Sequence, residues 1–416
     1  GPVQNNMSFN AEKGATRGLH AEPWDKFIGL AAGRIFGAWV DLREGPSFGK
    51  TFSIDMGVDK AVYVPRGVAN GYQALEDNTV YSYLVNDHWS PEARAEYTYV
   101  NLDDETANIP WPIPLADATI SGADAAHPRL AEVVPMKPRK TIIVGAKGQL
   151  GLALQRLYPD ADAVDVDELD LTDDAAVAAF DWHRYGTIIN AAAYTAVDKA
   201  ETPEGRRLCW AINVAAVGRL ARVAREHRAT LVHVSSDYVF DGTQREHDED
   251  EAFSPLGVYG QTKAAGDAIV GLLPRHYLVR TSWVIGEGHN FVRTMASLAE
   301  RGVKPAVVDD QFGRLTFTSD LAAAIKHLLD ANAPFGTYNV TSDGPIMSWH
   351  QIAQRVFELR GGSASHVGRQ STSDYADGKL VSPRPANSAL RLDKIKAVGF
   401  FPPDALLRLR EYLALT

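Results

Sequence analysis

The stretch TIIVGAKGQLG, residues 141–151, most restricts the folds that this chain can adopt. A run of β-branched residues is followed by glycines at positions 145, 148 and 151, and a helical pattern begins directly after them. Glycines at this spacing let the backbone approach a pyrophosphate, and the start of the helix offers free N–H groups. The stretch therefore predicts the first strand and helix of a nucleotide-binding α/β domain.

The hydrophobic period changes near residue 140, which predicts two domains. Upstream, turn residues separate short alternating runs, as in a sandwich, jelly roll or barrel; these lie at 34–43, 61–65 and 79–85. Downstream, apolar runs alternate with helical segments, as in a doubly wound parallel sheet. The apolar runs lie at 141–145, 187–190, 230–235 and 277–281, and the helical segments at 206–227, 258–273, 348–360 and 404–414. We expect an all-β domain over 1–130, a linker over 131–139, and an α/β domain with a small substrate lobe over 140–416.

Composition narrows the function classes. The 416 residues carry a net charge of −10, which argues against nucleic acid and anionic membranes as partners. No run approaches the ~20 apolar residues of a membrane span, and a single cysteine, Cys209, excludes an intramolecular disulfide. We expect a cytoplasmic protein with a buried, structural Cys209, and a solvated loop at the acidic run 245–251. Gly1 and Pro2 are typical of a protease scar, so the natural chain is expected to begin earlier.

Three further motifs point to a reductase. VSSDYVF places Ser235 and Ser236 at the end of a buried strand, where ligand sites of α/β sheets form. VYGQTK places Tyr259 and Lys263 four residues apart, on one face of a helix. A lysine beside a tyrosine lowers the pKa of the phenol, which makes the tyrosine a usable proton donor near neutral pH. The alanine-rich strand end at 190–195 lets a flat ring pack close to the backbone.

In this order the motifs resemble dTDP-4-dehydrorhamnose reductase, an extended short-chain dehydrogenase/reductase. RTSWV at 280–284, DQFGRLT at 310–316 and the segment SPRPANSALRLDKIK continue the resemblance toward the C-terminus. The resemblance implies that Ser236 binds the C4 carbonyl of the sugar, that Tyr259 protonates its oxygen, and that Lys263 holds the nicotinamide ribose.

The same resemblance implies a sugar-nucleotide pocket and a nicotinamide cofactor, NADPH or NADH. The sugar-nucleotide contacts are expected to be Trp283, Asn290 and Gln311, and Arg314, in RLT where the family usually has Ala-Pro-Thr, is expected to alter its loop. The residues expected to bind the cofactor are Gly145, Lys147, Gly148, Gln149, Leu150, Gly151, Asp170, Leu171, Ala191, Ala192, Ala193, Tyr259 and Lys263. Lys147 favours a 2′-phosphate and hence NADPH, whereas the acidic stretch 164–170 favours NADH. We expect a preference for NADPH, with use of both.

The upstream stretches resemble dTDP-4-dehydrorhamnose 3,5-epimerase, a cupin-type jelly roll. They are VQNNMSFNAEKGATRGLH at 3–20, VDLREGPSFGK at 40–50, VPRGVANGY at 64–72, VYSYLV at 80–85, ANIPWP at 107–112 and ISGADAAHPRL at 120–130. Inversion beside a ketone needs a base near pH 7, an orienting carboxylate, an enolate stabiliser and an acid on the opposite face. The resemblance implies that His20 is the base, with Asp124 as its partner, Lys26 as the stabiliser and Tyr83 as the acid.

Three more residues of this domain are expected to contact the substrate. The resemblance implies that Arg17 and Arg43 bind the diphosphate or the sugar. Asn70 stands where the family usually has histidine, so its contact lacks a positive charge. Cupin-type barrels often hold metals, but we find no His-x-His pair or spaced histidine cluster and expect no metal site.

The two resemblances imply a bifunctional enzyme that epimerises dTDP-4-dehydro-6-deoxyglucose at C3 and C5 and then reduces it at C4, giving dTDP-L-rhamnose. A homodimer through the jelly roll is the expected assembly. Two alternatives stay open. One is a monofunctional reductase with a degenerate epimerase domain, since Asn70 departs from the family and the family's first strands would precede residue 3. The other is a non-catalytic regulatory subunit of the reductase fold.

Overall fold

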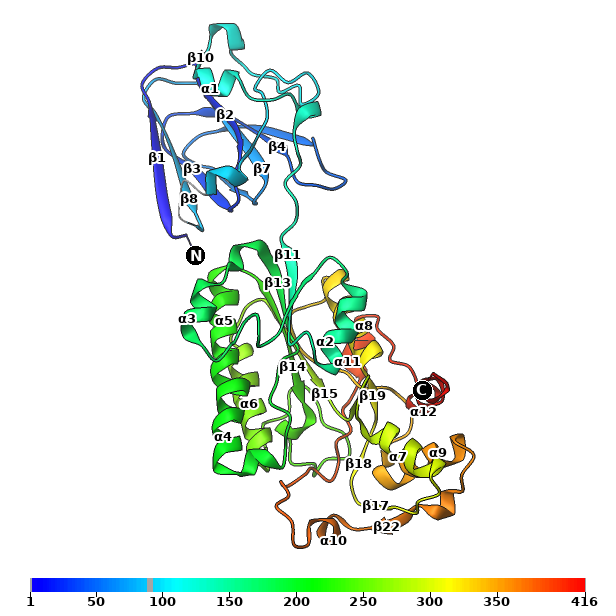
Figure 1. Ribbon diagram of the computed structural model, residues 1–416. Coiled ribbons are helices and arrows are strands. Elements are labelled where there is room, and N and C mark those ends of the chain that lie inside the picture. The colour runs from blue at the N-terminus through cyan, green and yellow to red at the C-terminus, as the bar shows by residue number, and fades with distance from the viewer. Residues whose placement is uncertain (1, 88–92, 416) are drawn as a thin grey trace. The chain divides into compact units, whose positions relative to one another are not determined.

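A computed structural model describes residues 2–87 and 93–415, so Gly1 of the expected scar lies outside the described residues. The chain forms two compact units, Gly1–Pro138 and Arg139–Thr416, and each is described by itself (Figure 1). Part of the expected linker, as far as Met136, is bonded to the first unit. The Met136 N–H donates a hydrogen bond to Leu42 O over 2.8 Å.

The N-terminal unit is a sandwich of two β-sheets, which confirms the predicted jelly roll. One sheet has the order β1-β8-β3-β6, and the other has the order β10-β2-β7-β4-β5, with β9 beside β2. The strands are β1 (Gln4–Asn10), β2 (Ala15–Ala21), β3 (Lys26–Ala32), β4 (Ile35–Asp41), β5 (Thr51–Met56), β6 (Ala61–Val64), β7 (Val68–Ala74), β8 (Thr79–Val85), β9 (Thr98–Tyr99) and β10 (Thr119–Ile120). The short helix α1 (Gly122–Ala125) follows β10, and 3-10 turns lie at 93–96, 115–117 and 130–132.

Alternating side chains explain why these strands form a sandwich. Along β1, residues are exposed and half-buried in turn, as expected of a strand with one face toward a core. Residues from both sheets, including Ile28, Trp39, Tyr72 and Tyr81, form one apolar cluster. The strand β4 is buried throughout its length because it lies inside its sheet, between β7 and β5.

The C-terminal unit is built on a six-stranded parallel sheet, as predicted. Its strands are β11 (Lys140–Val144), β12 (Asp162–Val164), β13 (Tyr185–Asn190), β14 (Thr230–Ser236), β15 (His276–Thr281) and β20 (Gly336–Asn339), in the order β12-β11-β13-β14-β15-β20. The strand order reverses direction between β11 and β13. In open α/β sheets a crevice forms at such a point, beyond the carboxyl ends of the strands.

Helices cover both faces of this sheet (Figure 1). On one face lie α3 (Asp174–Ala179), α4 (Pro203–Trp210), α5 (Ala216–Glu226) and α6 (Val258–Val270); on the other lie α2 (Gln149–Leu157), α8 (Thr318–Asp330) and α11 (Asp393–Ala397). A π-helical turn, Ala211–Ala215, joins α4 to α5, so the helix predicted at 206–227 is interrupted. Each face has its own buried apolar cluster. Cys209 is fully buried in α4, as predicted.

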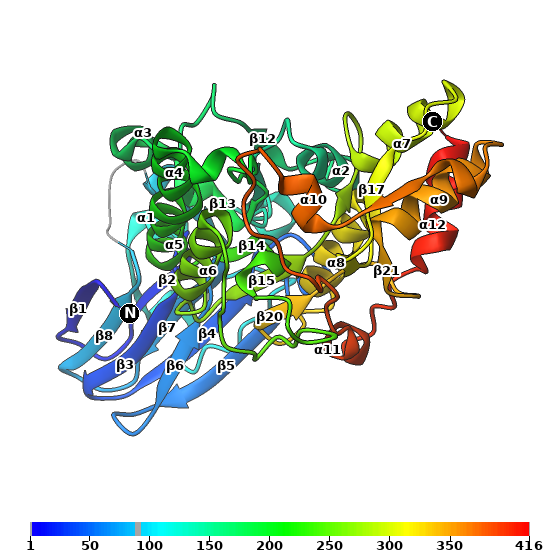
Figure 2. The ribbon, with the colours of Figure 1, turned by 90° about the horizontal axis from the view of Figure 1, so that it is seen from below.

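A smaller lobe extends from the sheet's C-terminal end, as Figures 1 and 2 show. It contains α7 (Phe291–Glu300), α9 (Trp349–Leu359), α10 (Thr372–Ala376) and α12 (Ala405–Ala414). Three two-stranded pairings belong to it: β16 (Val284–Ile285) with β19 (Thr316–Phe317), β17 (Ala306–Val308) with β22 (Gly368–Gln370), and β18 (Phe312–Gly313) with β21 (Met347–Ser348).

The acidic run 245–251 is not the solvated loop that its composition predicts. His247 is fully buried and stacks on Phe240, and Glu249 is buried with its carboxylate accepting the N–H of Asn339. Arg280 donates to the carbonyl oxygen of Glu249. Charged residues can enter a core when each finds a partner, and here Asn339 and Arg280 supply partners from strands outside the segment.

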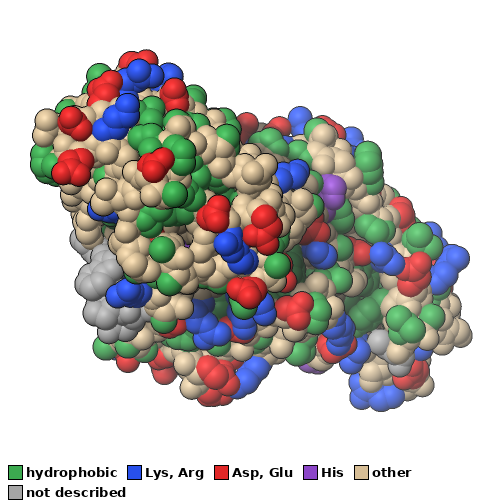
Figure 3. Space-filling model, turned by 90° about the horizontal axis from the view of Figure 1, so that it is seen from above, with side chains coloured by type: hydrophobic (Ala, Val, Ile, Leu, Met, Phe, Trp, Pro, Cys, Tyr) green, Lys and Arg blue, Asp and Glu red, His purple; other side chains and the backbone are tan. Residues whose placement is uncertain are grey.

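The surface is mixed in charge on the face drawn in Figure 3, where acidic and basic side chains lie close together among apolar ones. Among the described residues, no helix is long and apolar enough to cross a membrane.

Candidate active sites

His20 lies near the end of β2, after a bulge. The pairing of β2 with β7 shifts register between Arg17 and His20, and Gly18 has a φ of 118°, which favours glycine. His20 Nε2 lies 2.7 Å from Asp124 Oδ1. The Ser121 hydroxyl accepts from the N–H of Asp124 and caps α1, which holds the carboxylate in place. The predicted base and its partner are therefore in contact although 104 residues separate them.

Lys26 and Asn70 meet between the two sheets. Lys26 Nζ donates to Asn70 Oδ1 over 2.7 Å and forms an ion pair with Glu22. Asn70 in turn donates to the Tyr81 hydroxyl over 3.3 Å. Burial lowers the pKa of Lys26, and the negative charge of Glu22 opposes this shift. Asn70 thus contacts the amino group predicted to stabilise the enolate.

Tyr83 faces a cavity at the same end of the sandwich. The cavity has a volume of about 230 Å³ and is lined by Gln4, Asn6, Glu22, Trp24, Tyr83, Val85 and Tyr97. Lys26 Nζ lies 5.0 Å from the centre of the Tyr83 ring. Burial and the nearby Glu22 charge raise the pKa of Tyr83, so it carries its proton at neutral pH. A neutral phenol beside a lysine can donate a proton.

Arg17 and Arg43 are engaged by the protein itself. Arg17 donates to the carbonyl oxygens of Thr16 and Thr119. Arg43 holds Asp41 through two hydrogen bonds, of 2.8 and 2.6 Å. Neither arginine lines the cavity beside Tyr83. The sugar-nucleotide contacts predicted for them stay predictions.

His127 is a residue of this site that the sequence analysis missed. Its ring stacks on Tyr99 with a centroid distance of 4.7 Å and meets the edge of His20 at 5.2 Å. His20, Asp124 and His127 each offer a potential metal-ligand atom, and these atoms lie within 4.8 Å of one another. The expectation of no metal cluster rested on spacing along the chain, and the fold brings these groups together from distant segments. The stretch DAAHP, with His127 three residues after Asp124, was the available signal.

The glycine-rich loop of the C-terminal unit lines a pocket of about 310 Å³ at the reversal between β11 and β13. Eight predicted cofactor residues line it: Gly145, Lys147, Gly148, Asp170, Leu171, Ala191, Ala192 and Ala193. Asp165 and Val166, which the sequence analysis did not select individually, line it too. Eight of the thirteen predicted cofactor residues thus share one pocket beyond the carboxyl ends of the strands, and Gln149, Leu150, Gly151, Tyr259 and Lys263 are not among its lining residues.

The glycines make this pocket possible. Gly145 has a φ of 83°, and a Cβ there would lie 2.6 Å from the N atom of Ala192. A Cβ on Gly151 would collide with the carbonyl oxygen of Gly145. No side chain caps the start of α2, so its first N–H groups face the loop. The Leu150 side chain packs in the core and the Gln149 side chain donates to His289 O, so the cofactor contacts predicted for these two residues stay predictions.

Lys147 and the acidic stretch after β12 lie in direct contact. The Lys147 amino group forms an ion pair with Asp167, and its backbone N–H donates to Asp165 over 2.8 Å. The hydrogen bond with Asp167 raises the pKa of Lys147. The two features that favoured NADPH and NADH are therefore neighbours in the fold.

Ser236, Tyr259 and Lys263 converge beside the end of β14. Ser236 Oγ donates to Asp237 Oδ1 over 3.0 Å, and Lys263 Nζ donates to Val234 O over 2.7 Å. All three predicted residues are less than a tenth exposed. Because Tyr259 and Lys263 lie on one face of α6, both reach the strand end that carries Ser236.

Burial sets the protonation of this group. It lowers the pKa of Lys263 to about 8 and raises that of Asp237 to about 6. Burial and the Asp237 charge also raise the pKa of Tyr259, which the sequence analysis expected Lys263 to lower. Lys263 does not lower the pKa of Tyr259 because its amino group donates to the backbone carbonyl of Val234.

A second pocket, of about 370 Å³, lies between the sheet and the small lobe of the same unit. It is lined by Tyr238, Trp283, Phe291, Met295, Ala306, Val307, Val308, Gln311, Trp349, Gln370, Thr372, Tyr375, Arg384, Pro385 and Ser388. Trp283 stacks on Trp349 at a centroid distance of 3.8 Å. Gln311 donates to Thr372 Oγ1 over 3.0 Å. Two of the three predicted sugar-nucleotide contacts thus lie in one aromatic pocket.

Asn290 and Arg314 do not line this pocket, and their side chains contact other residues of the domain. Asn290 caps α7 by accepting the N–H of Arg293, and it donates to the Tyr412 hydroxyl. Arg314 donates to Glu246 and to the carbonyl oxygens of Gly344 and Leu390. It therefore connects three segments, and the effect predicted for Arg314 on its loop stays a prediction.

Comparisons with known proteins agree with this division. The dTDP-4-dehydrorhamnose 3,5-epimerase family matches residues 1–132, and the family described as RmlD substrate binding domain matches residues 139–414. A dTDP-4-dehydrorhamnose reductase of Aggregatibacter actinomycetemcomitans is 37% identical over 66% of this chain and 99% of its own length. An RmlC homolog of Streptococcus pyogenes serotype M6 is 49% identical over 33% of this chain and 70% of its own length. The chain belongs to both families: it is an epimerase domain fused to a reductase domain.

Solved structures support the assignment of the reductase domain. A dTDP-4-dehydrorhamnose reductase of Clostridium acetobutylicum is 35% identical and has a TM-score of 0.61, over 66% of this chain and 99% of its own. The reductase of Bacillus anthracis, solved in complex with NADP, is 32% identical with a TM-score of 0.61, over 67% of this chain and 99% of its own.

Proposed function

We propose that this chain catalyses two successive steps on one sugar nucleotide. The epimerase domain inverts C3 and C5 of dTDP-4-dehydro-6-deoxyglucose, and the reductase domain reduces the C4 ketone with NADPH or NADH, giving dTDP-L-rhamnose. The observation that carries the proposal is that each domain holds its own complete set of reactive side chains. His20 contacts Asp124 in one, and Ser236, Tyr259 and Lys263 converge in the other.

In the epimerase domain, His20 takes the proton from C3 or C5 and Asp124 orients it. Although burial alone would raise the pKa of Asp124, the hydrogen bond with His20 brings it below its ordinary value, so Asp124 stays ionised. An anionic partner favours the imidazolium that forms when His20 accepts a proton. Lys26 stabilises the enolate, and Tyr83 returns a proton from the opposite face.

In the reductase domain, Ser236 donates a hydrogen bond to the C4 carbonyl oxygen and Tyr259 gives that oxygen a proton. When bound, the nicotinamide cofactor supplies the hydride. The pocket fits such a group, because Gly145 and Gly151 leave room where side chains would collide, and the open start of α2 favours a pyrophosphate. Lys263 holds the ribose hydroxyls, and Lys147 favours a 2′-phosphate. Trp283 and Gln311 contact the sugar nucleotide.

Two pairs of variants test the assignment. His20→Gln should abolish solvent deuterium incorporation at C3 and C5 and leave the reduction of a ready-made epimerised ketone unchanged. Tyr259→Phe should lower reduction by about 10²–10⁴-fold and leave deuterium exchange unchanged. The matched controls are His366→Gln and Tyr277→Phe, which change the same residue types at positions of the reductase domain outside the proposed sites. The bifunctional assignment is wrong if the wild-type chain exchanges no deuterium or oxidises no cofactor.

The contacts of Asn70 bear on the alternative of a degenerate epimerase domain. Asn70, the departure that motivates this alternative, donates to Tyr81 and accepts from Lys26. The asparagine is therefore integrated in the polar network of the pocket, which favours an active epimerase. If the chain exchanges no deuterium at C3 and C5 but still reduces the epimerised ketone, the epimerase domain is degenerate.

We further propose a cytoplasmic homodimer formed through the outer face of the sheet β1-β8-β3-β6. Met7, Phe9, Phe27 and Tyr63 are each at least half exposed on this sheet, and Phe27 and Tyr63 are directly paired across β3 and β6. Large exposed apolar side chains that share one sheet face are typical of an interface. Sedimentation of the full chain should give twice the monomer mass, and Phe9→Asp with Phe27→Asp should give the monomer.

A further inference from the structure

The epimerase pocket places three metal-binding side chains at one point. His20 comes from β2, and Asp124 and His127 come from the segment after β10, yet their potential ligand atoms lie within 4.8 Å of one another. His20 Nε2 and Asp124 Oδ1 are already 2.7 Å apart. The Nδ1 atom of His127 is buried and has no hydrogen-bond partner among the described residues. One ring nitrogen of His127 is therefore uncommitted.

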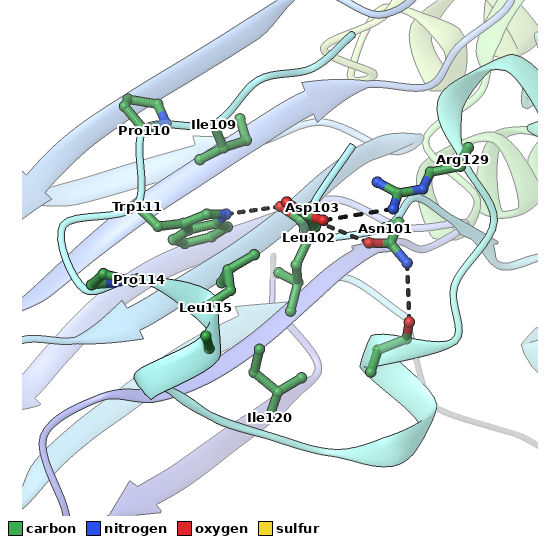
Figure 4. A pocket seen from close by; sticks show the side chains of 12 residues that line it. Asn101, Leu102, Asp103, Ile109, Pro110, Trp111, Pro114, Leu115, Ile120 and Arg129 are labelled. Carbon is green, nitrogen blue, oxygen red and sulfur yellow. Dashed lines mark hydrogen bonds and ion pairs between the residues drawn. The ribbon is translucent and has the colours of Figure 1, made fainter. Parts of the chain in front are cut away.

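The segment that carries Asp124 and His127 is held rigidly. The amide of Asn101 donates to Ala125 O over 3.0 Å and to His127 O over 2.9 Å, and Figure 4 shows the first of these bonds. Asn101 belongs to the wall of a cavity of about 740 Å³. Tyr99 of β9, which is paired with His20 of β2, stacks on the His127 ring. A bound ion therefore has little of this segment left to immobilise.

The ligand set matches the chemistry of a zinc ion. Two imidazoles and one carboxylate are a common set of three protein ligands at zinc sites with an open fourth position. Zinc–nitrogen bonds of about 2.05 Å in a tetrahedron place ligand atoms about 3.3 Å apart. The pair of His20 and Asp124 must therefore open by about 0.6 Å, and a pair as far apart as the 4.8 Å limit must close by about 1.5 Å, which side-chain rotation can supply.

We propose that His20, Asp124 and His127 bind one divalent cation of the zinc type, and that this ion blocks the epimerase reaction. The ion binds at His20 Nε2 and displaces the proton shared with Asp124. The neutral ring then carries that proton on Nδ1, the nitrogen whose lone pair would otherwise accept the substrate proton. No bond to the substrate changes, and removal of the ion restores the base. The inhibition rests on the proposed role of His20, whereas the binding of the ion does not.

Calorimetric titration of the untagged full chain with Zn²⁺ tests the site. The wild type should bind one Zn²⁺ that His127→Gln binds at least about tenfold more weakly, and His366→Gln should match the wild type. Co²⁺ should give visible absorption typical of tetrahedral coordination in the wild type, and Asp124→Asn should lose it. Circular dichroism establishes that each variant is folded. Equal zinc affinity in the wild type and His127→Gln would overturn the site.

Deuterium exchange at C3 and C5 tests the inhibition. Zn²⁺ should stop exchange in the wild type, a chelator should restore it, and His127→Gln should need at least about tenfold more Zn²⁺. Exchange that persists with the site filled refutes the inhibition. If the chelated wild type shows no exchange, the proposed epimerase function fails, while the calorimetric titration still decides whether the site exists.

Discussion

Asp237 links burial to pH-dependent stability in the reductase domain. Asp237 is the residue after Ser236 in the chain. It is only 2% exposed, and its carboxylate accepts a hydrogen bond from the Ser236 hydroxyl. Burial raises its pKa from 3.8 to about 6, although the hydroxyls of Ser388 and Ser236 oppose the shift. Asp237→Asn keeps the shape of the side chain and removes the titration.

The sign and size of the effect follow from the two pKa values. Because the folded pKa lies above the unfolded value of 3.8, the folded state keeps a proton that the unfolded chain has lost. The stabilisation is complete below the unfolded pKa and is lost as pH rises through about 6. The difference of about 2 units corresponds to about 3 kcal/mol in total, of which about 1.4 kcal/mol is lost between about pH 5 and about pH 8.

Urea unfolding at these two pH values measures the loss. Hydrogen–deuterium exchange of peptides from β14 and α6 reports the reductase domain separately from the epimerase domain. Between about pH 5 and pH 8, the free energy of unfolding should fall by about 1.4 kcal/mol more in the wild type than in Asp237→Asn. A control is Asp241→Asn, because hydrogen bonds from Thr243 lower the pKa of Asp241. Its carboxylate is therefore ionised in both the folded and the unfolded state between about pH 5 and pH 8 and adds no pH dependence there. Equal pH dependence in the wild type and Asp237→Asn would refute the reasoning.

Three further substitutions test other parts of the reductase domain. Gly151→Ala should lower stability by about 1–3 kcal/mol in a urea titration and weaken cofactor binding, because the new methyl group meets the Gly145 carbonyl; unchanged stability contradicts the close approach. Lys147→Ala should raise the KM for NADPH about tenfold and leave that for NADH unchanged; equal effects on both would remove Lys147 as the 2′-phosphate contact. Arg314→Met should cost about 2–3 kcal/mol in thermal unfolding, because it leaves Glu246 and two carbonyl oxygens unpaired; a neutral result contradicts its role as a tie.

The sequence predicted the architecture because strand and helix periods are local properties. The parallel sheet and the sandwich both follow from runs that can be read within ten residues. The contact of His20 with Asp124 was reached only through resemblance, since 104 residues separate the two side chains. The pocket beside the glycine-rich loop was predictable from position, because its residues follow strand ends that a parallel sheet brings to one edge.

The errors arose where tertiary contacts override local composition. The acidic run 245–251 looked solvated, yet Asn339 and Arg280 supply partners from distant strands. The substrate contact predicted for Asn290 stays a prediction, because the residue caps α7 and is not among the residues that line the aromatic pocket. His127 was overlooked because a histidine becomes a potential ligand only when the fold brings others beside it.

The most direct test of the account is one reaction followed to its product. The full chain is incubated in deuterated water with dTDP-4-dehydro-6-deoxyglucose and NADPH, and the product is examined by NMR. The account predicts one NADPH oxidised per sugar and a dTDP-L-rhamnose product that carries deuterium at both C3 and C5. Cofactor oxidation that yields a sugar without deuterium at these carbons, or no oxidation at all, would contradict the claim that two active domains act in sequence.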